Sequence, residues 1–206
     1  MPKQYNQPEE NIDDISLLEP TATYSYADYL RWTFEERVEI IKGKFFNMSP
    51  APVRIHQEVS VRLLTLFSNY LQGKKCKVYH APFDVRLPGK PDDPYDKVRS
   101  VVQPDIFIIC NEKILDDNGC NGAPDLIVEI ISPSTENRDL NQKYHLYQEN
   151  KVKEYWIAYP KEELLDVFLL DQDSNQYMPA ERYGINDDVP IRLFDGYSLR
   201  CIDIFR

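Results

Sequence analysis

The sequence lacks long apolar runs and a hydrophobic leader. No apolar run approaches the roughly 20 residues that a helix needs to cross a bilayer. The first residues, MPKQYNQPEENIDD, are polar and acidic, which is the opposite of a secretory leader. These two absences predict a cytoplasmic protein with no membrane partner.

Paired cysteines and zinc-ligand spacings are also missing. The four cysteines are scattered, with no CxxC pair among them: Cys76, Cys110, Cys120 and Cys201. Scattered cysteines in a chain without a leader are typical of reduced thiols. Because no Cys or His cluster has the spacing of zinc ligands, a zinc site is not expected.

The chain has no excess of basic residues, and its net charge of −10 argues against a protein that coats nucleic acid non-specifically. The acidity lies at the two ends. Residues 1–20 hold five acids and one base, and residues 161–206 hold ten acids and five bases. Residues 21–160 therefore keep 19 acids and 18 bases, so a local basic surface remains compatible with the composition.

The length of 206 residues fits one domain with an irregular tail. Residues 1–20 lack periodic apolar positions, which predicts a flexible N-terminal tail and leaves 21–206 as the domain. A domain of this size buries enough surface to fold without disulfides or a structural metal.

The first half of the domain predicts two helices, a hairpin and two strands. Residues 24–37 suggest a short helix with Ser25 as its N-cap, and Lys42-Gly43-Lys44 suggests a hairpin that SPAP at 49–52 ends. Strands are expected at 76–80 and 83–87, followed by a mobile surface loop at 88–100. The clearest helix is 54–72, closed by Gly73, with a buried stripe of Ile55, Val59, Leu63, Leu66 and Tyr70.

Three apolar runs predict central strands that are covered on both faces: 106–110, 126–131 and 155–159. A helix at 139–150 separates the second run from the third, which implies a right-handed crossover and parallel pairing. The first two runs are joined through turn-forming residues, so an antiparallel pair is expected there. The predicted fold class is α/β, a mixed β-sheet flanked by helices.

Glu129 is the anomaly in this pattern, because it interrupts the apolar run LIVEII. A lone buried carboxylate costs several kcal/mol unless it is paired, protonated or bound to a cation. Asp105 precedes the neighbouring run, and antiparallel pairing brings both residues to the same end of the sheet. Two converging carboxylates with hard oxygen ligands suit Mg²⁺ or Mn²⁺.

Lys143 is the candidate for the compensating charge. On a helical wheel for 139–150 it falls inside the apolar arc, which consists of Leu140, Tyr144, Leu146 and Tyr147. A lysine on a core-facing side needs a partner, and the short connection from Glu129 lets it reach back. Glu129 and Lys143 could instead form a purely structural ion pair, and Asp105 could be a turn residue after Pro104.

Ordinary roles are favoured for the other polar side chains near these motifs. A turn role is expected for Asp125, loop and capping roles for Ser132 and Ser134, and a solvated position for Arg138, with a phosphate contact as its alternative. Tyr155 and Trp156 are expected in a core strand.

Several motifs occur in a fixed order from about residue 24 to 170: VEIIKG, SPAP with His56 shortly after, QPDIFIIC, GAPDLIVEIISPST, RDLNQK and KEYWIAYP. In this order they resemble the bacterial "putative restriction endonuclease" family of the PD-(D/E)XK nuclease superfamily. The resemblance implies a restriction-endonuclease-like core with Asp105 and Glu129 as metal ligands. It adds Glu39 as an acidic residue near the site. His56, on the polar side of its helix, could contact substrate or support the ligands, or serve only in capping or packing.

Three departures from the family pattern concern lysines, and one of them is Lys44, which stands where relatives usually have an acid. The superfamily places its lysine two residues after the acid, where this chain has Ile131, so the resemblance assigns that role to Lys143 on the following helix. Lys151 stands where many relatives have Gly at the end of this helix.

The resemblance and the charged residues together predict a Mg²⁺-dependent (or Mn²⁺-dependent) endonuclease that hydrolyses DNA. By analogy with the fold, a homodimer is expected, because cutting both strands requires two sites. The alternative is an inactive nuclease fold that acts as a binding or regulatory module. Glycoside hydrolysis by the carboxylate pair is disfavoured, because a buried lysine accompanies it and clustered sugar-binding aromatics are missing.

Overall fold

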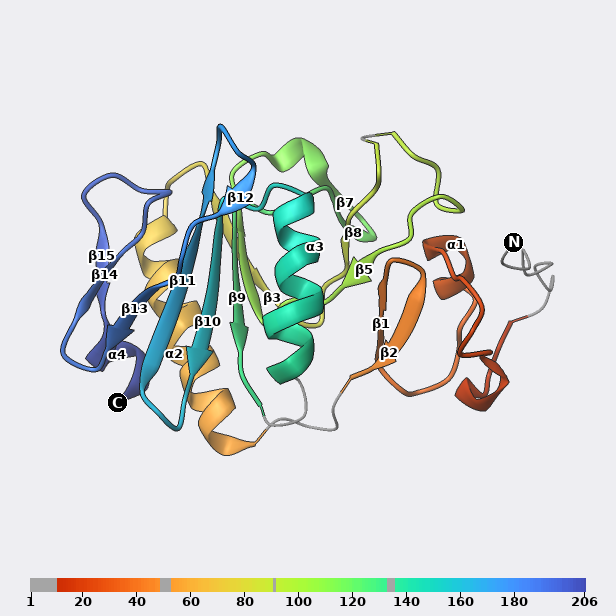
Figure 1. Ribbon diagram of the computed structural model, residues 1–206, viewed down its shortest axis with the longest axis horizontal. Coiled ribbons are helices and arrows are strands. Elements are labelled where there is room, and N and C mark those ends of the chain that lie inside the picture. The colour runs from red at the N-terminus through yellow and green to blue at the C-terminus, as the bar shows by residue number, and fades with distance from the viewer. Residues whose placement is uncertain (1–10, 49–52, 91, 133–135) are drawn as a thin grey trace.

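A computed structural model describes residues 11–48, 53–90, 92–132 and 136–206 (Figure 1). A seven-stranded sheet forms its centre, in the order β12-β11-β10-β9-β6-β3, with β13 paired to β11. Its strands are β3 (Lys77–His80), β6 (Ile106–Ile109), β9 (Leu126–Ile130), β10 (Glu154–Tyr159), β11 (Leu164–Asp171), β12 (Gln176–Tyr177) and β13 (Glu181–Gly184).

A second, six-stranded sheet lies beside the first in the order β2-β1-β5-β4-β8-β7. It consists of β1 (Val38–Ile41), β2 (Lys44–Asn47), β4 (Val85–Arg86), β5 (Val101–Val102), β7 (Leu115–Asp116) and β8 (Gly119–Asn121). Near the C-terminus, β14 (Asp188–Pro190) and β15 (Ser198–Arg200) form a separate two-stranded sheet.

Helices cover both faces of the central sheet. In Figure 1, α2 (Arg54–Leu71) lies behind the sheet and α3 (Tyr144–Glu149) lies in front of it. A π-helix, η3 (Arg138–Lys143), leads directly into α3. The remaining short helices are η1 (Ile15–Leu17), α1 (Tyr26–Tyr29), η2 (Glu112–Ile114) and α4 (Cys201–Phe205).

Alternating residues of the central strands supply two separate hydrophobic cores. Ile106, Val128 and Trp156 pack with α2 on one face, whereas Phe107 and Ile127 pack with α3 on the other. Both faces of β6 and β9 are therefore buried, as their continuous apolar runs predict. Glu129 has the same strand parity as Ile127, so it lies on the face that η3 and α3 cover.

The predicted pairing of the central strands is confirmed. Strand β6 pairs with β9 antiparallel, with Ile106 opposite Val128, and β10 pairs with β9 parallel, with Ile157 opposite Glu129. The predicted hairpin is present as β1 and β2. The SPAP segment at 49–52 lies outside the described residues.

The helix expected over 24–37 is much shorter, since only 26–29 is α-helical. Ser25 forms the predicted N-cap, with a complete capping box to Asp28. Beyond the helix, Trp32 bridges to Ile12 and stacks on Phe34, with ring centroids 5.6 Å apart. Aromatic packing thus outweighs the local helical preference after residue 30.

The buried stripe of α2 differs from the predicted one. Val59 and Leu63 are fully buried as expected, but the other buried positions are His56, Phe67 and Leu71. Ile55, Leu66 and Tyr70 are half-buried beside them. Apolar residues occupy two adjacent rows of this helix, so spacing alone did not identify the row that faces the sheet. Placing His56 on the polar side was wrong.

The prediction of four reduced cysteines is wrong for one pair. Cys76 and Cys110 form a disulfide, while Cys120 and Cys201 are free and buried. The cause is the strand register: Lys77 lies opposite Ile109 in the β3–β6 pair, which places the two cysteines at the next opposed positions.

The described residues before residue 21, which we expected to belong to a flexible tail, pack against the domain. Leu18 is buried with Tyr24 and Ile40, and Asp14 caps η1. Residues 1–10 lie outside the described residues. In the described ranges, no helix has the length and apolar character that a membrane span requires.

The 88–100 segment contains buried residues as well as turns. Val98 is fully buried and its carbonyl accepts a hydrogen bond from the backbone of Tyr26. The last residues of this segment thus connect α1 to the second sheet.

Candidate active site

Glu129 lies near the end of β9 with 3% of its surface exposed. Its Oε1 accepts hydrogen bonds from Lys143 Nζ at 2.9 Å and from the Tyr147 hydroxyl at 2.7 Å. Both donors come from the η3–α3 segment and are four residues apart, so they lie on one face of it. The anomalous glutamate is therefore paired by the helical segment that covers its side of the sheet.

Lys143 connects the carboxylates of three elements. Its ammonium lies 2.9 Å from Glu129 Oε1, 2.9 Å from Glu39 Oε1 and 3.6 Å from Asp139 Oδ1, with 5% of the side chain exposed. Lys143 is the last residue of the π-helix, which continues as α3. Single-turn π segments occur often at functional sites in proteins.

Asp105 stands just before β6, next to the end of β9. Its Oδ2 accepts a hydrogen bond of 2.8 Å from the backbone of Ile130, the residue after Glu129. His56 Nε2 on α2 lies 3.3 Å from the same oxygen. Asp105 is thus held from β9 on one side and from α2 on the other, at the same end of the sheet as Glu129.

Glu39 brings the second sheet into the cluster. It is 1% exposed on β1, and its Oε1 accepts a hydrogen bond of 2.9 Å from the backbone of Gln103, two residues before Asp105. Arg138 lies 3.4 Å from Glu39 Oε2, and its guanidinium also donates to the carbonyl of Asn47 at 2.9 Å. The cluster therefore lies where the two sheets, α2 and η3 meet.

Burial and mutual charge shift the protonation of these groups. Burial raises the pKa of Glu129 well above its ordinary value, and Asp139, Asp105 and Glu39 add to this although Lys143 opposes it. Burial lowers the pKa of Lys143, but the surrounding carboxylates outweigh it and raise this pKa well above the usual range. Lys143 is therefore charged at neutral pH.

The pKa values of His56 and Tyr147 are also raised. Burial lowers the pKa of His56, but the Asp105 carboxylate, the backbone of Ile130 and the charge of Asp139 together outweigh burial, so the net shift is upward. Burial and the Glu129 carboxylate raise the pKa of Tyr147 well above its usual range, so its hydroxyl remains a neutral donor. His56 Nδ1 is buried without a hydrogen-bond partner.

The donor chemistry of the cluster fits a hard divalent cation. Three carboxylates lie within ion-pair distance of Lys143 or Arg138, namely Glu39, Glu129 and Asp139, and Asp105 lies next to them at the end of β9. The carboxyl groups therefore outnumber the two cationic side chains. Within the described residues, Glu129 Oε2 and Asp105 Oδ1 accept no hydrogen bond. No three His, Cys, Asp or Glu side chains of the described ranges group as a complete metal cage. Two carboxylates are sufficient for Mg²⁺, which keeps several waters and takes substrate phosphates as ligands.

The predicted contact between Lys143 and the carboxylates is confirmed, whereas the chemical roles of these residues stay predictions. Arg138 is not the solvated side chain that we expected, because it contacts Glu39 and lies over the Phe46 ring. Tyr147 was assigned only to the apolar arc. Its position four residues after Lys143 is the signal that marks it as a second donor to Glu129.

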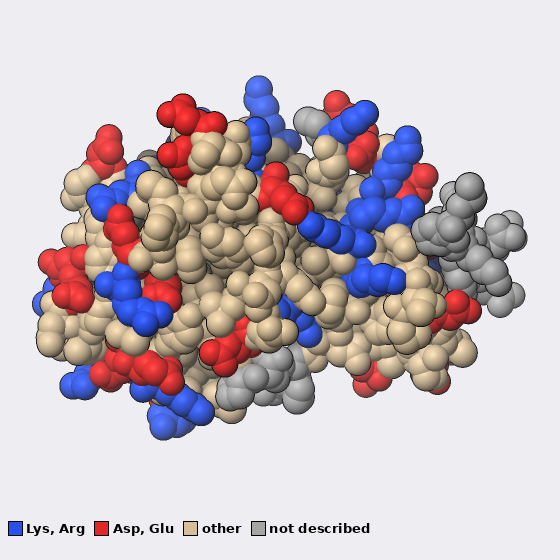
Figure 2. All heavy atoms as spheres, in the orientation of Figure 1, with Lys and Arg blue, Asp and Glu red and all other residues tan. Residues whose placement is uncertain are grey.

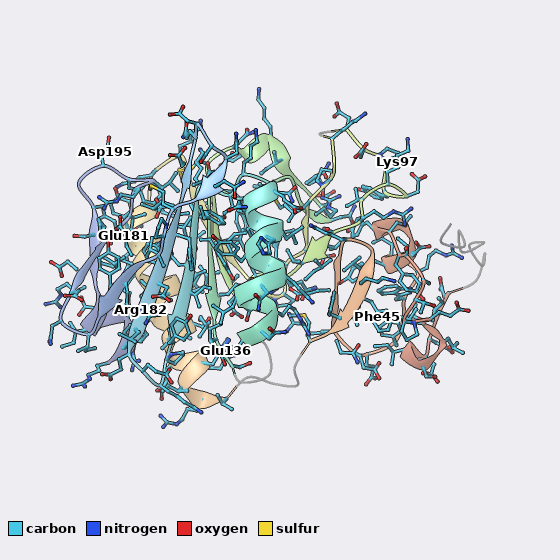
Figure 3. The ribbon with its side chains drawn as sticks, viewed as in Figure 1. Phe45, Lys97, Glu136, Glu181, Arg182 and Asp195 are labelled. Atoms are coloured by element: carbon cyan, nitrogen blue, oxygen red, sulfur yellow. A yellow bond between two sulfur atoms is a disulfide. The ribbon has the colours of Figure 1, made fainter. Side chains whose placement is uncertain are left out.

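The ordinary roles expected for other residues agree with their contacts. Asp125 accepts from the backbone of Cys110 at 2.7 Å and from Lys153 Nζ at 2.7 Å. Tyr155 and Trp156 are fully buried in β10. Ser134 lies outside the described residues, and Glu136 follows them near the start of η3 (Figure 3).

Residues 26–201 match the model of the protein family described as "Uma2: Putative restriction endonuclease". This match spans most of the chain and includes every residue of the cluster. The chain belongs to this family. Its resemblance to the putative restriction endonuclease family, first suggested by the order of its motifs, is confirmed.

One curated relative is the "Uncharacterized protein slr1290" of Synechocystis sp., which is 26% identical over 159 residues. The alignment covers 76% of this chain and 79% of the relative. Among solved structures, a "putative nuclease belonging to DUF820" from Anabaena variabilis superimposes with a TM-score of 0.67 at 19% identity. It covers 88% of this chain and 97% of that one, and the likeness shows that the two share the mixed α/β fold.

Proposed function

We propose that this member of the family is a metal-dependent endonuclease that hydrolyses phosphodiester bonds in DNA. One observation carries the proposal: buried carboxylates from β1, β9 and η3 lie within ion-pair distance of the Lys143 ammonium, Asp105 lies at the same end of the sheet, and the carboxyl groups outnumber the cations. A structural ion pair needs only equal numbers of opposite charges. The excess of carboxylate oxygen suits a site that binds a further cation.

The residues divide into two roles. Asp105 and Glu129 would hold Mg²⁺ or Mn²⁺, which when bound lowers the pKa of a coordinated water and polarises the scissile phosphate. Hydrolysis joins a water oxygen to phosphorus and breaks one phosphorus–oxygen ester bond. We assign to Lys143 the stabilisation of the negative charge that develops on the phosphate oxygens. Glu39 and Asp139 keep the ammonium in place.

The surface charge distribution supports contact with a polyanion. Figure 2 shows Lys and Arg side chains gathered over β1 and the segment between β4 and β5. Lys97 lies at that end, whereas Glu181 and Asp195 lie at the opposite end, near the C-terminal strands (Figure 3). Both signs of charge occur at each end in Figure 2, but residues 161–206 carry ten acids against five bases, so the face over β1 would accept the DNA backbone more readily than the C-terminal end.

A plasmid-nicking assay tests the proposal. Supercoiled DNA is incubated with the wild type and with Glu129→Ala, Lys143→Ala and Glu154→Gln, in Mg²⁺, in Mn²⁺ and in EDTA. We expect cleavage only with metal, a loss of at least about 100-fold in the first two variants, and wild-type activity in Glu154→Gln. Circular dichroism of each variant checks the fold. Cleavage by Glu129→Ala at the wild-type rate would contradict the assigned site.

Two copies of the chain would be needed to cut both strands of a duplex at one position. We therefore infer a homodimer as the form that makes double-strand breaks. Light scattering of the purified chain with and without duplex DNA measures its mass directly. A monomer that only nicks one strand would contradict this part of the proposal.

A second function, DNA binding without turnover, is favoured by one observation. Lys143 already neutralises part of the carboxylate cluster, because it lies within ion-pair distance of Glu39, Glu129 and Asp139. A binding module would retain DNA in a gel-shift assay and show no cleavage with either metal. The same pair of assays thus separates the two functions.

A further inference from the structure

Glu129 uses its two carboxylate oxygens unequally. Oε1 accepts from both Lys143 Nζ and the Tyr147 hydroxyl, at 2.9 and 2.7 Å. Oε2 accepts no hydrogen bond from the described residues. A carboxylate oxygen has about two lone-pair sites, so these donors fill Oε1.

Asp105 shows the same inequality. Its Oδ2 accepts from the backbone of Ile130 at 2.8 Å, and His56 Nε2 lies 3.3 Å from it. Oδ1 accepts no hydrogen bond within the described part of the chain. Each of the two proposed metal ligands therefore has one oxygen held by the protein and one left for another partner.

Tyr147 differs from the other donors because its hydroxyl serves Glu129 alone. Lys143 divides its contacts among three carboxylates, whereas the Tyr147 hydroxyl donates only to Glu129 among the described residues. Its ring is fully buried and packs edge-on against Tyr155, with centroids 5.0 Å apart. A neutral and rigid donor orients the carboxylate without changing the charge of the cluster.

We propose that Tyr147 is a positioning residue of the metal site, which holds Glu129 Oε1 so that Oε2 is presented to the cation. His56 has the matching part at Asp105, where it holds Oδ2 and leaves Oδ1 for the same cation. This inference rests on the proposed metal-dependent function and deepens it. In this proposal, Tyr147 and His56 control the affinity for the metal although neither side chain touches metal or DNA.

The test measures Mn²⁺ binding to the full chain by isothermal titration calorimetry and by the loss of the free Mn²⁺ signal in electron paramagnetic resonance. Tyr147→Phe is compared with Tyr177→Phe, which removes another buried hydroxyl, bonded to the carbonyl of Val152 at 3.0 Å. We expect the Kd for Mn²⁺ to rise at least about 10-fold in Tyr147→Phe and to stay at the wild-type value in Tyr177→Phe.

The metal dependence of cleavage supplies a second readout. The Mn²⁺ concentration for half-maximal nicking by Tyr147→Phe should rise by the same factor as its Kd, while saturating Mn²⁺ restores most of the rate. A purely structural role for Tyr147 would lower stability without moving either quantity, and that result would overturn the inference.

His56→Leu keeps the inference testable if Tyr147→Phe does not fold, because it removes the matching contact to Asp105. It should weaken Mn²⁺ binding by a similar factor, and an unchanged Kd would overturn the inference. Failure of the proposed function gives a different result: the wild type itself would not bind Mn²⁺. Wild-type binding with an unchanged Kd in the variants overturns only the roles of Tyr147 and His56.

Discussion

Two buried glutamates on adjacent strands of the central sheet have different surroundings. Glu129 lies near the end of β9 and Glu154 begins β10, and the strands run parallel, with Glu154 opposite Leu126. The two residues therefore lie toward opposite ends of the same pair of strands. Their exposures are nearly equal, 3% and 2%. Burial alone does not distinguish them.

The donors around each carboxylate do distinguish them. Glu154 accepts one N–H on each oxygen, from the Trp156 indole at 3.1 Å and from the backbone of Leu193. Glu129 has both donors on one oxygen, and one of them is a charged lysine shared with other carboxylates. The protein supplies a donor to each Glu154 oxygen, whereas it leaves Glu129 Oε2 without one among the described residues, with capacity for a cation. Buried acids with such surplus capacity are the candidates for function.

Removing the ammonium should have the largest effect on stability. Lys143→Met keeps an unbranched stem without the ammonium, which leaves Glu129 buried without its cation and Glu39 with Arg138 alone. We expect the free energy of unfolding at pH 7 to fall by about 3–5 kcal/mol, as for one partner of a buried ion pair. Urea denaturation followed by circular dichroism measures this change. A fall below about 1 kcal/mol would mean that the cluster is well hydrated and not desolvated as its burial indicates.

Glu154 should give the next largest effect, as a dependence of stability on pH. Burial raises its pKa from 4.5 to about 7, so the folded state binds the proton more tightly than the unfolded state. Stability from this group is full below pH 4.5 and is lost as the pH rises through about 7. We expect the difference in unfolding free energy between wild type and Glu154→Gln to change by up to ~3 kcal/mol across this window. A difference independent of pH would show that Glu154 is ionised in the folded protein throughout.

Divalent metal should stabilise the folded protein by binding at the Glu129 end of the sheet and not at the Glu154 end. At a Mg²⁺ or Mn²⁺ concentration ten times the Kd, linkage adds about 1.4 kcal/mol, or roughly 3–6 °C in Tm for a chain of this size. The gain should vanish in Asp105→Asn and persist in Glu154→Gln, as differential scanning fluorimetry can measure. An equal gain in Asp105→Asn would place the bound metal elsewhere on the protein.

The central sheet was predictable because its signals are local. The apolar runs that became β6, β9 and β10 are continuous and bounded by turns, and their pairing followed from what joins them, a helix for the parallel pair and turn-forming residues for the antiparallel pair. Glu129 was equally easy to identify, because it is a charged residue within an apolar strand. Its contact with Lys143 followed from helical spacing even though η3 is a π-helix, since four-residue neighbours still share a face.

The features that were missed depend on tertiary contacts that a single segment does not encode. The bond between Cys76 and Cys110 follows from the β3–β6 register, and the burial of His56 follows from which row of α2 meets the sheet. The second donor to Glu129, Tyr147, looked like an ordinary core aromatic. Lys151 has a φ of 62°, in the left-handed region that favours glycine, which would account for the glycine that the family resemblance leads us to expect at this position.

The smallest expected effect comes from a lysine at the other end of the same strands. Lys153, just before β10, pairs with Asp125, just before β9, at 2.7 Å, but 55% of the lysine side chain is exposed. Lys153→Met removes the same charge as Lys143→Met and leaves a carboxylate that still accepts from the backbone of Cys110 and can be hydrated. We expect a loss of about 0.5 kcal/mol or less in urea denaturation, reduced further by 0.5 M salt. If the two lysine substitutions cost the same, burial would not set the strength of these pairs, and the excess of buried carboxylate around Glu129 would no longer single it out as a cation site.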